Sequence, residues 1–160
     1  SIRRQSDDGQ RLDRHGVPDM NVHAKKIIPV ALEHVMDAKN KDWSPDFRSL
    51  CRGAGAHIRV NGLVSFIAYS IVKAEKFEAA GHLVKSIREG LTAMQDPPPA
   101  TQQDNHQFLS DLRRMSLEQY MPVVRHSLLV ALWLKRLAET MIEETTPDQQ
   151  PAEAQHDRQP

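Results

Sequence analysis

The chain has 160 residues and no net formal charge, because 21 Lys and Arg residues balance 21 Asp and Glu residues. This is the length of about one domain, and it suffices for a hydrophobic core without disulfide or metal crosslinks. The neutral balance excludes a general attraction to nucleic acid or to membranes, so partners must be inferred from local clusters. A single cysteine, Cys51, excludes an internal disulfide framework and a multi-cysteine metal site, which favours a reducing compartment.

The sequence predicts neither a membrane span nor a secretory signal. No apolar run approaches the roughly 18 residues that a spanning helix needs. The first twenty residues lack the hydrophobic middle of a signal peptide. We therefore expect a cytoplasmic protein with no membrane partner.

Three polar segments delimit the predicted domain. Residues 1–19 and 146–160 hold too little apolar surface to offset the entropy of ordering them, so both are predicted to be disordered tails. Residues 96–103, which begin Asp-Pro-Pro-Pro, cannot be helical through the prolines and are predicted to be an exposed connector. The helical domain is predicted to span residues 20–145.

The apolar residues between these segments recur three and four positions apart, which predicts helices and no strands. The first helix is predicted at residues 20–40, with a kink at Pro29. The second is predicted to be capped by Ser44 and to end near Val60, where Asn61-Gly62 breaks the chain. The third covers residues 63–74.

The remaining predicted helices continue this pattern to residue 141. One is predicted at residues 77–94 and a short one, capped by Asp104, at residues 104–115. Ser116 and Gln119 have capping-box spacing, but Pro122 is predicted to interrupt the last helix, with a turn before it and a restart at the proline. The fold class is therefore all-α, a compact bundle of five to six helices.

Catalytic and metal-binding patterns are missing from the sequence. His23 and His34 share a helix face, but three turns separate them by about 16 Å, too far for one ion. Cys51 and His57, six residues apart, do not share a face, and no HExxH motif occurs. We therefore predict no enzymatic activity, no catalytic residue, no metal and no cofactor.

A row of arginines on the second helix is the most informative cluster. Arg48, Arg52 and Arg59 fall within about 40° of one another on the helical wheel, so we expect them to face outward together. Guanidinium groups in a row suit phosphates, because each can donate two hydrogen bonds to phosphate oxygens. The alternative interpretation is a solvated helix face that pairs with acids from elsewhere in the fold.

Few aromatic residues are expected at the surface, so any nucleic-acid contact should be to backbone and not to bases. Trp43 and Tyr120 are the candidates at helix ends, whereas Phe66, Tyr69 and Trp133 are predicted to lie in the core.

Two motifs then give a family resemblance. They are Gly55-Ala-His-Ile-Arg-Val-Asn-Gly-Leu-Val-Ser-Phe-Ile-Ala-Tyr69 with Lys73, and, after Tyr120, Ala131-Leu-Trp-Leu-Lys-Arg-Leu-Ala138. In this order and spacing the chain resembles the small subunit of type III-B CRISPR effector (Cmr) complexes, over about residues 24–141. The alternative is that it resembles a small subunit of a related type III complex.

The resemblance implies a non-catalytic helical protein of antiviral defence that stacks head to tail in several copies with other CRISPR effector subunits. It implies contact with the backbones of guide RNA and target RNA. Arg59, Asn61 and Lys73 lie inside the matched segment, and Arg48 and Arg52 join them from the helical wheel, which gives five expected RNA-binding residues. The rival hypothesis is a helical adaptor that binds only proteins.

Overall fold

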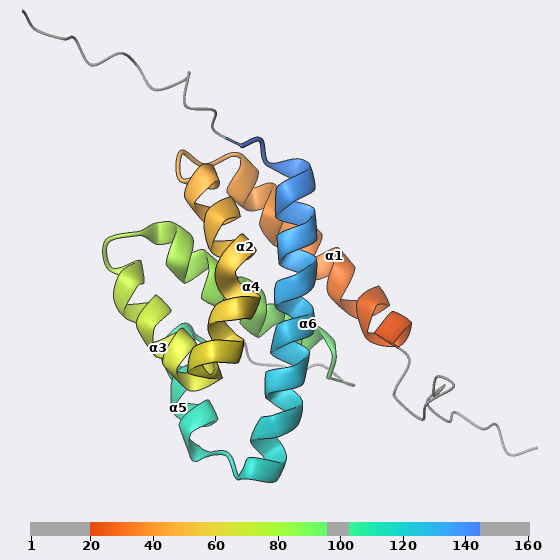
Figure 1. Ribbon diagram of the computed structural model, residues 1–160, viewed down its shortest axis with the longest axis vertical. Coiled ribbons are helices and arrows are strands. Elements are labelled where there is room, and N and C mark those ends of the chain that lie inside the picture. The colour runs from red at the N-terminus through yellow and green to blue at the C-terminus, as the bar shows by residue number, and fades with distance from the viewer. Residues whose placement is uncertain (1–19, 96–102, 145–160) are drawn as a thin grey trace, which may run out of the picture.

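The computed structural model describes residues 20–95 and 103–144, and within these ranges it holds six helices and no strand (Figure 1). The helices are α1 (Met20–Lys39), α2 (Ser44–Asn61), α3 (Leu63–Ala74), α4 (Glu78–Ala93), α5 (Asn105–Arg114) and α6 (Leu117–Met141). The predicted all-α fold is confirmed. The predicted tails 1–19 and 146–160 and nearly all of the predicted connector 96–103 lie outside the described residues.

Helices α4 and α6 form the centre of the bundle. Helix α6 runs the length of the bundle in Figure 1 and packs against α1, α2 and α4, while α4 also packs against α3 and α5. Their buried residues recur at helical spacing, as in Leu83, Val84 and Ile87 of α4 and Val130, Leu134 and Ala138 of α6. Removing these apolar surfaces from water is the main force that holds the bundle together.

The turn between α2 and α3 depends on one glycine. Gly62 has φ +84° and ψ 157°, a backbone conformation that residues with a Cβ rarely adopt. Its N–H donates to the carbonyl of Ile58 at 2.9 Å, which closes α2, and its carbonyl accepts from Phe66 N–H at 3.1 Å, which opens α3. The break predicted at Asn61-Gly62 is therefore confirmed, as a direct junction of two helices.

The interruption predicted at Pro122 is wrong. Helix α6 is continuous from Leu117 to Met141 with Pro122 inside it. The capping box is present: Ser116 Oγ accepts from Gln119 N–H at 3.3 Å, and the Gln119 side chain accepts from Ser116 N–H at 3.1 Å. Pro122 costs the helix one hydrogen bond, and the packing of α6 against α1, α2 and α4 outweighs that loss.

The two other predicted caps have different outcomes. Asp104 caps α5, since its Oδ1 accepts from Gln107 N–H at 2.7 Å. Ser44 is not a cap, because its N–H donates to Lys41 O at 3.1 Å and the residue lies inside the first turn of α2. Trp43 precedes it without any side-chain capping bond.

Cys51 lies on the inner face of α2 and is 1% exposed. Burial raises the pKa of its thiol well above the usual range, so the group stays protonated. None of the helices in the described part of the chain is long and apolar enough to cross a membrane.

Candidate nucleic-acid interface

The arginine row of α2 lies along its contact with the end of α6. Arg48 Nε donates to the carbonyl of Ile142 at 3.1 Å, and its Nη1 is 3.9 Å from Glu144 Oε1. The Arg48 side chain is only 14% exposed. The expectation that this guanidinium faces outward is therefore wrong, because a carbonyl beyond the last turn of α6 holds it against the protein.

Arg52 pairs with the same segment but stays accessible. Its Nε donates to Glu139 Oε1 at 3.3 Å, and its Nη1 is 3.9 Å from Glu144, while 56% of the side chain is exposed. The alternative interpretation, pairing with acids from elsewhere in the fold, thus describes Arg48 and Arg52. An exposed ion pair contributes about 0–1 kcal/mol, so these carboxylates hold Arg52 only weakly.

Arg59 and Asn61 are exposed in the last turn of α2. A Cβ on Gly55 would lie 3.6 Å from Nη1 of Arg59, so the Arg59 side chain extends back along the helix over this glycine. Among the residues that the structure describes, no carboxylate oxygen lies within 4.0 Å of the Arg59 guanidinium. Of the three arginines, Arg59 alone is exposed and has no carboxylate partner among the described residues.

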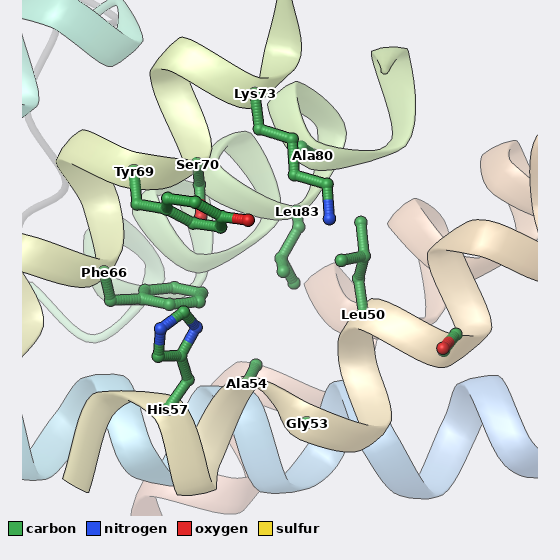
Figure 2. Close-up of a pocket in the computed structure, with 11 residues that line it drawn as sticks. Leu50, Gly53, Ala54, His57, Phe66, Tyr69, Ser70, Lys73, Ala80 and Leu83 are labelled. Atoms are coloured by element: carbon green, nitrogen blue, oxygen red, sulfur yellow. The ribbon is translucent and has the colours of Figure 1, made fainter. Parts of the chain in front are cut away.

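Lys73 lies apart from the arginines, at a groove between α2 and α3 (Figure 2). Its Nζ is 5.8 Å from the ring centroid of Tyr69 and 5.6 Å from that of Phe77, distances at which a cation is attracted to an aromatic ring. The five predicted RNA-binding residues therefore divide into an α2 row and a separate groove, with Asn61 at the turn between the two helices.

The aromatic residues follow the predictions only in part. Phe66 is in the core at 3% exposed, and Trp133 packs against the core. Tyr69, predicted to be buried, is 55% exposed. The sequence could have indicated this exposure. The buried residues of α3 are 63, 66, 67 and 70, and residue 69 falls outside that stripe.

Both aromatic residues expected at the surface are engaged within the fold. Trp43 is half-buried and its Nε1 donates to Glu78 Oε2 at 3.0 Å. The hydroxyl of Tyr120 accepts from the N–H of Val64 at 3.2 Å, which ties the start of α6 to α3.

A histidine cluster joins α1 to α4. His34 Nε2 pairs with a carboxylate oxygen of Glu89, and His82 Nε2 donates to the His34 carbonyl at 2.8 Å. His82 also packs against Trp43 and Phe47, with ring centroids 5.2 and 5.0 Å away. No group of three or more metal-ligating side chains occurs in the ranges that the structure describes. The cluster packs α1 against α4, and His82 also lines a surface pocket together with Lys85 and His106.

Comparisons with known proteins agree with this fold. The sequence pattern of the family Cas_Cmr5, "CRISPR-associated protein (Cas_Cmr5)", matches residues 23–141. A solved crystal structure of a CRISPR-associated Cmr5 family protein from Thermus thermophilus superimposes with a TM-score of 0.63 at 22% sequence identity. The match covers 76% of this chain and 98% of that one. No curated protein sequence matches the chain significantly.

Proposed function

The chain belongs to the Cas_Cmr5 family, the small subunits of type III CRISPR effector complexes, and we propose that in such a complex it stacks in several copies and grips RNA by its backbone. In this role the subunit performs no chemistry of its own. It positions guide RNA and target RNA for other effector subunits, in the cytoplasm, as part of antiviral defence.

The observation that carries the RNA-binding proposal is the accessible basic surface of α2. Arg59 is exposed without a carboxylate partner among the described residues, and Arg52 is more than half exposed beside it in the same row. Repeated along a stack of copies, such a row gives phosphate contacts without reading the sequence of the strand. We leave Arg48 out of this contact, because its guanidinium is held by the carbonyl of Ile142.

Two separate apolar surfaces support the stacking of copies. One is on the outer side of α1, where Val22, Leu32 and Met36 are 47, 38 and 39% exposed. The other lies where α3 ends, with Val72 and Phe77 at 66 and 52%. A head-to-tail stack needs two different complementary surfaces on each copy, and the absence of net charge avoids repulsion between copies.

The decisive experiment measures RNA affinity against salt in the reconstituted effector complex. The test variant is Arg52→Gln with Arg59→Gln, and the matched control is Arg113→Gln with Arg114→Gln, two exposed arginines at the end of α5. Each lost contact to a single strand should reduce the slope of log affinity against log salt by about 0.7. We expect the test variant to flatten the slope by about 1.4 for each copy of the subunit that contacts the strand, and the control to leave it unchanged.

The competing function is a helical adaptor that binds only protein subunits. The carboxylate pairs of Arg48 and Arg52 and the exposed apolar surfaces favour it. An adaptor predicts that Arg52→Gln with Arg59→Gln changes neither the affinity nor the slope while the complex assembles normally. That result would remove RNA contact by α2 from the proposal.

A further inference from the structure

The groove between α2 and α3 is a slot with walls of different chemistry. It has a volume of about 220 Å³ and is lined by Leu50, Ala54, His57, Tyr69, Lys73 and Leu83, among others. Figure 2 shows the rings of His57, Phe66 and Tyr69 on one side and Leu50 on the other, with Leu83 between them. Lys73 extends from α3 so that its ammonium points into the space between Tyr69 and Leu50.

The size of the slot selects a small flat occupant. Its volume is about 220 Å³. This is less than the roughly 300–1,000 Å³ typical of pockets for drug-sized ligands. A single heteroaromatic ring fits such a space, provided that the groups attached to it remain outside.

Lys73, whose ammonium lies between Tyr69 and Leu50, selects the chemistry of the groups attached to the ring. Lys73 has no carboxylate oxygen within 4.0 Å among the residues that the structure describes, so its charge is available to an anion. His57 packs edge-on against Phe66 and Tyr69, with centroids 5.4 and 5.6 Å away, which holds the aromatic wall in place. An aromatic wall next to a cation is the arrangement that stacks a base of a single strand and neutralises its phosphate.

We propose that the α2–α3 groove takes one unstacked base of the RNA strand against Tyr69, with the adjoining phosphate at Lys73. The proposal rests on the proposed function, since it places a second contact on the same strand. Stacking is tolerant of sequence because every base presents a π face, so the contact would space the strand along the stack without selecting its sequence.

Three substitutions test the slot without altering charge. Tyr69→Leu removes the stacking ring from a position that is 55% exposed, and Tyr69→Phe restores the ring. Gly53→Leu fills the slot from the opposite side, where a Cβ meets no atom within 4 Å. In the assembled complex we expect Tyr69→Leu and Gly53→Leu to weaken RNA binding by at least about fivefold, and Tyr69→Phe to retain wild-type affinity.

A photocrosslink identifies the contacted segment of the chain directly. The probe is target or guide RNA carrying 5-iodouridine at single positions, irradiated in the complex and digested with trypsin. We expect the crosslink in the peptide spanning residues 60–73, which contains Tyr69, at positions that recur along the strand.

The outcomes separate this proposal from the function on which it rests. If Arg52→Gln with Arg59→Gln flattens the salt slope but Tyr69→Leu and Gly53→Leu leave RNA affinity unchanged, the base slot is overturned and backbone contact stands. If none of these variants changes RNA affinity or its salt dependence, both the base slot and the backbone contact are overturned. If the slot variants instead reduce the number of copies in the complex by native mass spectrometry, the groove holds a protein segment and the base slot is overturned.

Discussion

Gly90 of α4 faces Val130 of α6 with no room for a side chain between them: a Cβ at position 90 would lie 2.7 Å from Cγ1 and 2.9 Å from Cγ2 of Val130. Val130 is fully buried, so its methyl groups have no free space to move into. The two central helices of the bundle therefore pack tightly against each other at this glycine.

Gly90→Ala should destabilise the protein although alanine is the better helix former. The helix gains about 0.5–1 kcal/mol from the substitution, but overpacking a filled core costs about 1–3 kcal/mol. We expect a net loss of up to about 2.5 kcal/mol in the free energy of unfolding, measured by urea denaturation followed by circular dichroism.

Two further variants test whether overpacking against Val130 causes the lower stability of Gly90→Ala. Gly53→Ala, where a Cβ meets nothing within 4 Å, should stabilise the protein by about 0.5–1 kcal/mol. Val130→Ala should cost less in the Gly90→Ala background than in the wild type, because the new methyl group occupies part of the vacated space. Strict additivity of the two changes would contradict the close approach.

Gly62→Ala should loosen the junction of α2 and α3. At φ +84° and ψ 157° an alanine is strained by about 1–3 kcal/mol wherever its side chain points, and a Cβ there meets no neighbouring atom. The loss should therefore come from backbone strain alone. Hydrogen exchange should show faster opening of the amides of residues 62 and 66, whose hydrogen bonds close α2 and open α3.

Arg48→Met should weaken the attachment of the end of α6. The methionine keeps an apolar side chain of similar length but leaves the Ile142 carbonyl without its side-chain donor, at a cost of about 1–2 kcal/mol. Arg59→Gln, at an exposed position, should change stability by less than about 0.5 kcal/mol. Equal stability of the two variants would show that Arg48 has no structural role.

Acid should destabilise the bundle through His82. Burial lowers the pKa of its imidazole, and the nearby charges of His34 and Lys85 act in the same direction, against the His34 carbonyl and Asp37. A histidine whose folded pKa lies below its unfolded value of about 6.5 binds protons more readily in the unfolded chain. Its contribution to stability is therefore complete above a pH of about 6.5 and is lost as the pH falls through the folded pKa.

Denaturation curves between about pH 7.5 and 5 measure this effect. His82→Gln should reduce the loss of stability on acidification, whereas His106→Gln, on the exposed side of α5, should not. Part of the pH dependence should persist in His82→Gln, because burial also lowers the pKa of His126 beside His23. An unchanged pH profile in His82→Gln would exclude His82 as the source.

The helices were predictable from sequence because their apolar stripes and end signals are local. The stripes of α4 and α6, the Asp104 cap and the Asn61-Gly62 break each depend on residues within a few positions. Pro122 was misjudged because its penalty is local whereas the packing of α6 that outweighs it is tertiary.

The site was less predictable, because its charges are decided by distant partners. Arg48 finds its acceptor 94 residues further along the chain, and Arg52 finds Glu139 87 residues away, pairings that a helical wheel of α2 cannot contain. The helical wheel of α2 placed the arginines on one face of the helix. It did not show that the end of α6 packs against this face. Tyr69 was predictable in principle, from its position beside the buried stripe of α3.

The burial of Cys51 has a practical consequence. Its sulfur is shielded in the fold, and the chain has no second cysteine. A thiol-reactive dye added to the native protein should therefore react only when the core opens. The labelling rate then reports the frequency of that opening, free or within the assembled complex, without any engineered reporter group.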